Sequence, residues 1–202
     1  MYCSKSGSYV KQHQPLKTTT MLTPLQKRKQ IHFFQILDFD RNGLIQRKDF
    51  EDIAENLSVI RSLDRNSKDH KFIRNLSLSI WNNMKKHVNA TDGNLDMWLT
   101  FMDSFVINSN NEWYDQYVKG MTQTVFDVFD TDRNGYISLD EYLDLFIGLR
   151  IEVRFAPVSF EKLDLNSDGK ISKSELVKSV EEFLKSDDPA AGGNWLFGHW
   201  EL

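Results

Sequence analysis

The sequence predicts an all-α protein assembled from repeated helix–loop–helix units. One pattern occurs three times in the 202 residues, at 37–50, 129–142 and 163–176. Each copy has an apolar residue followed by Asp, with Gly five positions after the Asp, Ile two positions later and a carboxylate eleven positions after the Asp. A Phe stands three residues before the apolar residue, which places both on one face of an entering helix. An apolar residue after each loop opens an exiting helix.

The first ordered element is expected at Thr23-Pro24, because Thr caps helices and Pro fits the first helical turn. Residues 1–21 are polar and have no hydrophobic period, so we predict a flexible tail there. The repeat then predicts an N-terminal pair of units over 22–108 and a C-terminal pair over 109–186. An aromatic segment, 187–202, is expected to pack on the core.

The twelve-residue loops in these copies carry the ligands that Ca²⁺ prefers. Ca²⁺ takes six to eight oxygens at about 2.3–2.6 Å, supplied by side chains at positions 1, 3 and 5, a carbonyl at 7 and a two-oxygen carboxylate at 12. Gly at position 6 permits a positive φ, and the apolar residue at 8 lets two loops pair through a short β-bridge. The predicted ligands of loop 130–141 are Asp130, Asp132, Asn134, the Tyr136 carbonyl, Ser138 and Glu141. Those of loop 164–175 are Asp164, Asn166, Asp168, the Lys170 carbonyl, Ser172 and Glu175.

The first loop, 38–49, closes on Asp49 where the other two close on Glu. Its remaining predicted ligands are Asp38, Asp40, Asn42, the Leu44 carbonyl and Gln46. The shorter Asp reaches the ion less readily with both oxygens, and six-coordinate geometry suits Mg²⁺. We therefore predict that 38–49 is the weakest of three Ca²⁺ sites and the one that Mg²⁺ occupies most readily.

This unit is the EF-hand, which nearly always occurs in pairs, so the loop 38–49 needs a partner between residues 60 and 110. The segment around Gly93 supplies it if Gly93 takes position 6 and Leu95 position 8. That alignment places Val88, Ala90 and Leu99 at positions 1, 3 and 12, where none of the three side chains can ligate a cation. The second hand is predicted to be structural.

Composition excludes several other classes of protein. The net charge of −4 and the lack of a dense basic run argue against nucleic-acid binding. No apolar stretch approaches the roughly 18 residues of a membrane span. A single Cys3, the lack of a signal-peptide core and Tyr2 in place of a myristoylated Gly favour a cytoplasmic protein. Five scattered His and the lack of catalytic motifs indicate that it is not an enzyme, and we expect a monomer.

The closing segment SDDPAAGGNWLFGHW (186–200), with three functional hands and a defunct second one, resembles the sarcoplasmic calcium-binding proteins and calerythrin. The resemblance extends from about Leu22 to the end of the chain. It implies two tightly packed EF-hand lobes that act as a Ca²⁺ and often Mg²⁺ buffer. The 6 Met and 14 Phe favour a buffer independently, because sensors expose flexible Met-rich grooves.

Two alternatives stay open. A calcium sensor would expose a groove for a partner helix, with Trp195 and Trp200 as candidate anchors for that partner. A ligand carrier would resemble the coelenterazine-binding proteins and photoproteins, whose four-hand shell has a cavity lined by aromatic residues, Trp and His. The candidate residues for such a cavity are Trp81, Trp98, Trp113, Trp195 and His199.

Overall fold

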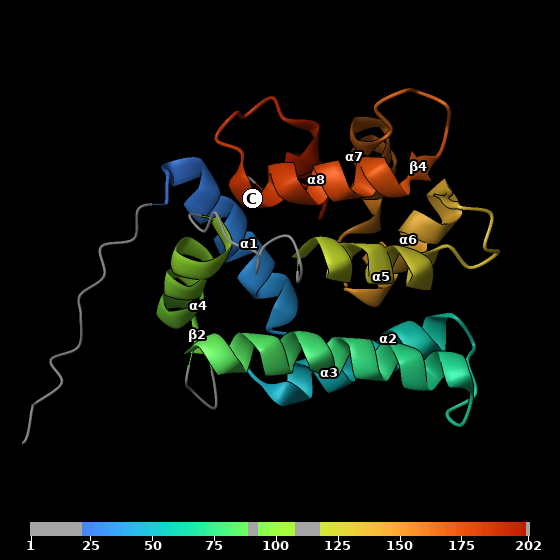
Figure 1. Ribbon diagram of the computed structural model, residues 1–202, viewed down its shortest axis with the longest axis horizontal. Coiled ribbons are helices and arrows are strands. Elements are labelled where there is room, and N and C mark those ends of the chain that lie inside the picture. The colour runs from blue at the N-terminus through green and yellow to red at the C-terminus, as the bar shows by residue number, and fades with distance from the viewer. Residues whose placement is uncertain (1–21, 89–92, 108–117, 201–202) are drawn as a thin grey trace, which may run out of the picture.

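The computed structural model describes residues 22–88, 93–107 and 118–200, and its helices are joined by loops that pair through short strands (Figure 1). The predicted fold class is confirmed. The predicted tail, 1–21, lies outside the described residues. The N-terminal half contains α1 (Pro24–Leu37), β1 (Leu44–Ile45), α2 (Arg47–Ile60), α3 (Lys68–Val88), β2 (Gly93–Asn94), α4 (Leu95–Phe101) and the π-helix η1 (Met102–Ile107). The C-terminal half contains α5 (Gly120–Phe129), β3 (Tyr136–Ile137), α6 (Leu139–Gly148), the 3₁₀ helix η3 (Val153–Phe155), α7 (Ala156–Leu163), β4 (Ile171–Ser172), α8 (Lys173–Lys185) and the 3₁₀ helix η4 (Gly192–Trp195).

The start of α1 lies where the sequence predicts it. The Thr23 hydroxyl accepts a hydrogen bond from the Gln26 backbone N–H at 3.2 Å, and the Gln26 side chain accepts one from the Thr23 N–H at 3.1 Å. This capping box satisfies N–H groups that a helix start leaves unpaired, and Pro24 adds no unpaired N–H. Residue 23 therefore fixes where the first entering helix begins.

Two short antiparallel bridges join the loops into pairs. In the C-terminal pair, Tyr136 faces Ser172 and Ile137 faces Ile171. The apolar position-8 residues thus meet each other, and both are almost fully buried. In the N-terminal pair, Leu44 faces Asn94 and Ile45 faces Gly93.

This register corrects the predicted alignment of the second hand. Gly93 faces the position-8 residue Ile45, so it occupies position 8 and not position 6. Asn94 then occupies position 9 and caps α4 by accepting from the Met97 N–H at 3.0 Å, as Ser138 and Ser172 cap α6 and α8. Five residues, 89–93, lie between the end of the entering helix α3 and this cap. In each of the other three hands, eight residues lie between the end of the entering helix and the cap of the exiting helix. The second loop is thus three residues short of a metal-binding loop.

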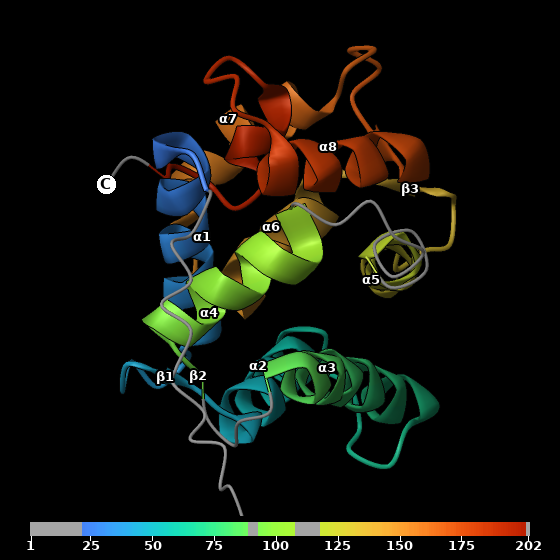
Figure 2. The same ribbon diagram turned by 60° about the vertical axis from the view of Figure 1, so that its left-hand side comes forward.

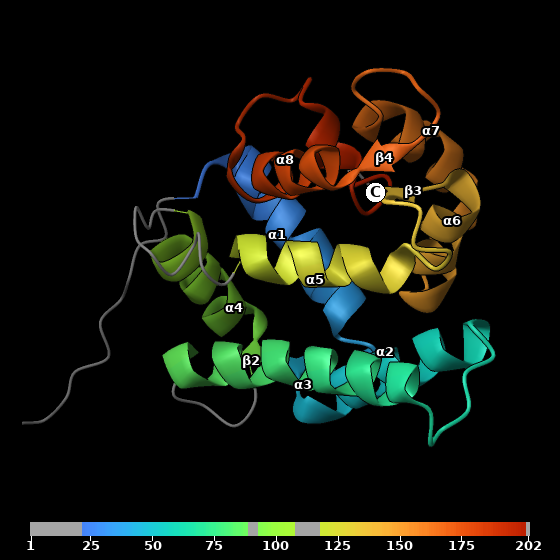
Figure 3. The ribbon, with the colours of Figure 1, turned by 45° about the vertical axis from the view of Figure 1, so that its right-hand side comes forward.

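The helices of the two halves interleave around one core. In Figure 1, α1 runs from beside α8 to the layer formed by α2 and α3, and Figure 2 shows α4 alongside α1. Figure 3 shows α5 between α8 and α3. The hydrophobic core is continuous across both halves. Among the described residues, no helix has the length and apolar composition that crossing a membrane requires.

The segment that follows α8 folds back onto α1, α6 and α8. Leu196 and Trp200 are buried, and the Tyr142 hydroxyl donates to the Leu196 carbonyl at 2.7 Å. The buried Lys29 ammonium of α1 donates to the Asn194 side chain at 2.8 Å and to the Ser186 carbonyl at 2.8 Å. The first entering helix, the last exiting helix and the C-terminal segment are therefore bonded together.

Candidate metal centres

The three loops that carry predicted ligands share one backbone conformation. The Gly at position 6 has a φ of +83°, +85° and +79° at Gly43, Gly135 and Gly169. A Cβ at any of these glycines would meet no atom within 4 Å, so the glycine is needed for its backbone conformation and not for space. Position 4 is also left-handed in each loop, with φ values of 60°, 59° and 58° at non-glycine residues. This second left-handed position could not be predicted, because its residues, Arg41, Arg133 and Ser167, share no side-chain type.

The carboxylate at position 1 is held in the same way in each loop. Asp130 accepts from the Asn134 N–H at 2.9 Å and from the Gly135 N–H at 3.0 Å. The corresponding distances are 3.0 and 2.8 Å at Asp38, and 3.1 and 2.7 Å at Asp164. The position-3 and position-5 oxygens accept from backbone N–H groups two residues later, through Asp40, Asn42, Asp132, Asn134, Asn166 and Asp168. These bonds fix the side-chain oxygens that the sequence predicts as ligands.

The carboxylate at position 12 is anchored at both oxygens. Glu141 accepts from the Thr131 N–H at 2.7 Å with one oxygen, and from the Ser138 N–H and hydroxyl at 2.8 and 2.9 Å with the other. Glu175 accepts from the Ser172 N–H and hydroxyl at 2.8 and 2.7 Å. Burial acts to raise the pKa of each Glu, but the hydrogen bonds outweigh it and both pKa values lie below the ordinary value. Both side chains are therefore ionised, as a calcium ligand must be.

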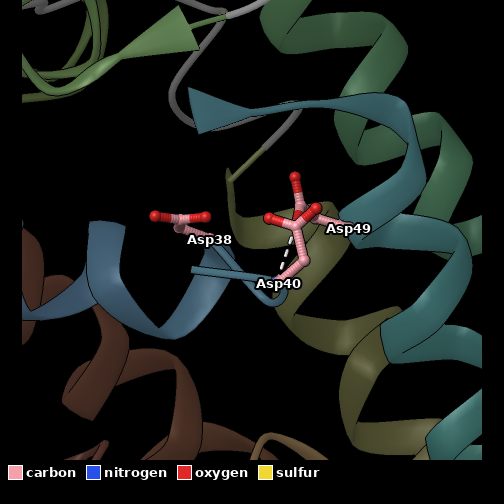
Figure 4. Close-up of side chains that lie close together, drawn as sticks. All are labelled: Asp38, Asp40 and Asp49. Atoms are coloured by element: carbon pink, nitrogen blue, oxygen red, sulfur yellow. Dashed lines mark hydrogen bonds between the residues drawn. The ribbon is translucent and has the colours of Figure 1, made fainter. Parts of the chain in front are cut away.

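Two of the loops gather three carboxylates closely enough to share one cation. Oxygens of Asp38, Asp40 and Asp49 lie within 4.8 Å of one another. Figure 4 shows the three side chains, which come from the residue after α1, the loop and the first turn of α2. The same holds for Asp130, Asp132 and Glu141. In loop 164–175, position 3 is Asn166, and Asp164, Asp168 and Glu175 do not form such a group. The predicted carbonyl ligands Leu44 and Tyr136 lie in β1 and β3, and Lys170 immediately precedes β4.

The first loop differs from the other two at Asp49. This carboxylate accepts from the Phe39 and Gln46 N–H groups at 2.9 and 2.7 Å, but no hydroxyl of the described residues donates to it. Burial raises the pKa of Asp49 above its ordinary value despite those hydrogen bonds. The Gln46 oxygen lies 3.1 Å from the Asn42 amide nitrogen, so the side chain at position 9 points toward the ligands of the loop.

A contact from the other half of the molecule supports this loop. Arg150 donates to the Phe39 carbonyl at 3.2 Å, and its guanidinium lies 3.8 Å from the centre of the Phe39 ring. Arg150 itself has a φ of 56°. Sequence reasoning missed this residue because it is 111 positions away from Phe39 and belongs to no repeat.

The paired hands, their bridges and the oxygen-bearing loops define a calcium-binding protein of the EF-hand type. A family model described as an EF hand matches residues 158–184, and one described as an EF-hand domain pair matches residues 119–147. These segments contain loops 164–175 and 130–141.

Curated relatives and solved structures agree with this class. The sarcoplasmic calcium-binding protein of Hediste diversicolor is 30% identical over 127 residues, which cover 63% of this chain and 71% of that protein. Calerythrin of Saccharopolyspora erythraea is 22% identical over 153 residues, covering 74% of this chain and 86% of that protein. The solved coelenterazine-binding protein of Renilla muelleri has a TM-score of 0.70 at 22% identity and covers 88% of this chain and 99% of its own. The chain belongs to the family of sarcoplasmic calcium-binding proteins and calerythrin.

A second feature is an apolar cavity of about 280 Å³ between the two halves. Residues that flank the loops line it, namely Leu37, Phe50, Phe129 and Leu176. Protein interiors rarely contain voids larger than one water molecule, whose share of liquid volume is about 30 Å³. The cavity therefore exceeds ordinary packing defects in size.

Of the five residues considered for a coelenterazine-type cavity, the four that the structure describes do not line one common cavity. Trp98 lines the apolar cavity, whereas the buried Trp81 packs against Phe50 outside it. Trp195 and His199 contact each other in the C-terminal segment, and His199 lines a separate pocket beside loop 38–49. The remaining residue, Trp113, lies outside the described residues.

Proposed function

We propose that this protein is a Ca²⁺ buffer that binds three ions, at loops 38–49, 130–141 and 164–175, with no enzymatic activity. The observation that carries the proposal is the hydrogen-bond framework common to the three loops, which holds oxygens at positions 1, 3, 5 and 12 in one arrangement. Such oxygens are the ligands that Ca²⁺ and Mg²⁺ take in proteins. As a monomer in the cytoplasm, the protein would keep its single Cys reduced.

The packing of the exiting helices supports a buffer over a sensor. A sensor opens by moving its exiting helices apart from the entering ones. Here α2 and α6, which exit the first and third hands, pack so closely at Gly148 that a Cβ there would lie 2.1 Å from a Leu57 methyl carbon. Asn56 of α2 also donates to the Gly148 carbonyl at 2.8 Å. Moving one of these exiting helices without the other would break this contact, so it would restrain the opening of either hand.

The C-terminal segment restrains the fourth hand. Gly193 lies so close to α8 that a Cβ there would be 2.4 Å from the Ser179 carbonyl oxygen, and its N–H donates to Glu182 at 2.8 Å. This contact supports a buffer, because it would hinder the movement of α8 that exposing a target surface requires.

Calorimetric titration with Ca²⁺, with and without millimolar Mg²⁺, tests the ion count. We expect three Ca²⁺ per chain, and Mg²⁺ should weaken binding most at loop 38–49. Fluorescence of a hydrophobic dye tests the mode of action, because a buffer should not bind more dye when Ca²⁺ is added. A rise in dye binding with Ca²⁺, together with capture of an amphipathic helical peptide, would establish the sensor instead.

The apolar cavity favours a second candidate function, the carriage of a small apolar ligand. The coelenterazine-binding protein of Renilla muelleri shows that a protein of this fold can be a ligand carrier. A luciferin-type occupant contains an aromatic chromophore and should absorb at roughly 350–500 nm. An absorbance spectrum of the purified protein therefore tests for it. A protein without such absorbance excludes a bound chromophore but not a colourless apolar ligand.

A further inference from the structure

The chemistry of the cavity wall restricts what can occupy it. Among the described residues that line the cavity there is no Asp, Glu, Lys, Arg or His. A charged group placed inside would lose its hydration without gaining an opposite charge, which is strongly unfavourable. The occupant should therefore be neutral.

The polar groups of the wall are mostly engaged with the protein itself. The Ser77 hydroxyl donates to the Phe50 carbonyl at 2.6 Å, and the Thr122 hydroxyl donates to the Val118 carbonyl at 2.8 Å. The Trp98 indole N–H donates to the Gln30 carbonyl at 3.0 Å. None of these donors is free for a ligand with several hydroxyl groups.

Asn83 is the exception. Its half-buried side chain lines the cavity and has no hydrogen-bond partner among the described residues. An amide offers both a donor and an acceptor, so it suits a single hydroxyl or a similar neutral head group. Apart from Ser77 and Thr122, whose hydroxyl hydrogens are donated to backbone carbonyls, the other described residues that line the cavity around Trp98 have apolar or aromatic side chains.

We propose that the cavity binds a neutral single-chain lipid, with its alkyl chain among the core side chains and its one hydrogen-bonding head group at Asn83. The proposal rests on the second candidate function given above and names its ligand class. At about 30 Å³ for a group the size of a water molecule, 280 Å³ accommodates roughly nine such groups. A chain of about ten carbons therefore matches the volume, and 1-decanol is the probe of choice.

The first test compares head groups of the same chain length on the full-length protein. Calorimetry should show saturable binding of one 1-decanol per chain, and binding of decanoate at pH 8 should be at least tenfold weaker because its charge is unpaired in the cavity. Equal binding of decanol and decanoate would overturn the neutral-ligand assignment. If no decanol binds up to its solubility limit, the cavity is not a lipid site.

The second test fills the cavity. Val125→Phe combined with Val180→Phe adds two rings at half-buried positions that line it, and should weaken decanol binding more than tenfold. The control is Val59→Phe, because Val59 is 65% exposed and does not line the cavity. Melting temperature and Ca²⁺ stoichiometry are measured on both variants. Unchanged decanol binding in a double variant that keeps its melting temperature would contradict the proposal.

The third test addresses the head group. Asn83→Leu removes the amide while keeping similar volume, so decanol binding should weaken about three- to tenfold, the range expected for one hydrogen bond. Decane binding should stay the same or increase. If decanol and decane respond equally, Asn83 does not bind the head group.

The lipid proposal and the calcium proposal can fail separately. Ca²⁺ stoichiometry is measured without lipid, and decanol binding is measured both with Ca²⁺ and with chelator. Three Ca²⁺ without decanol binding would overturn the lipid site alone, whereas decanol binding without Ca²⁺ binding would overturn the buffer alone.

Discussion

The two pairs of EF-hands differ in the length of their second loop. In the C-terminal pair, loops 130–141 and 164–175 both have the full length, and hydrogen bonds hold the predicted ligand oxygens of both loops in place. In the N-terminal pair, the partner of loop 38–49 is three residues short, yet it forms the same kind of bridge, with Ile45 facing Gly93. The pairing of two loops therefore needs only the few residues of the bridge and the helix cap that follows it. Ion binding needs the whole loop, because the ligands are spread from position 1 to position 12.

The largest expected effect is that of metal removal, and it should be unequal between the pairs. Each ion that binds only the native state stabilises it by about 4 kcal/mol at a thousandfold excess over Kd. With two proposed sites against one, the C-terminal pair should loosen more in chelator. Hydrogen exchange should show faster exchange in α6 and α8 than in α3 and α4. Equal loosening of both pairs, or no change in melting temperature, would contradict the assignment of sites.

The next effect concerns the segment that ties the pairs together. Gly193→Ala forces a Cβ to within 2.4 Å of the Ser179 carbonyl, so it should destabilise the protein by about 1–3 kcal/mol and expose dye-binding surface. Gly120→Ala is the matched control, since a Cβ there meets no atom within 4 Å. Urea unfolding of both variants measures the difference. Similar midpoints would show that the C-terminal segment contributes little to the stability of the fold.

A third change makes the first loop resemble the loops of the C-terminal pair. Asp49→Glu should raise Ca²⁺ affinity at loop 38–49 about tenfold, on the order of 1.4 kcal/mol, because the longer side chain reaches the ion with both oxygens. Mg²⁺ competition at that loop should decrease. Glu141→Asp is the reciprocal control and should weaken its own loop. Equal Mg²⁺ competition at all three loops in the unaltered protein would refute the argument from side-chain length.

The smallest effect tests the structural role of the second hand. Asn94→Ala removes the cap of α4 and should cost about 1 kcal/mol of stability while leaving the Ca²⁺ stoichiometry at three. Ser172→Ala, at the corresponding position of loop 164–175, also removes a hydroxyl that donates to Glu175 at 2.7 Å. It should therefore lower Ca²⁺ affinity as well as stability. A loss of one ion on changing Asn94 would show that the second hand binds metal after all.

The sequence by itself determined the fold class, and it predicts the ligand positions of three loops from hydrogen-bonding side chains that the structure places within each loop. Their hydrogen bonds join residues two to ten positions apart within one loop, as between Gly135 and Asp130 or between Thr131 and Glu141. Because these bonds are local, the sequence pattern that forms them can be recognised each time it recurs along the chain. The cap at Thr23 is local for the same reason.

The tertiary structure decided what depends on distant partners. The alignment predicted from sequence placed Gly93 at position 6, which was wrong. Only the pairing of Gly93 with Ile45 in the folded protein sets the register of this divergent loop. The three hydrogen bonds of the buried Lys29 go to residues 153 to 165 positions away. The apolar cavity is likewise formed by loop-flanking residues from both halves. Such contacts leave no periodic trace in the sequence, since each is made once, between elements that meet only after the chain has folded.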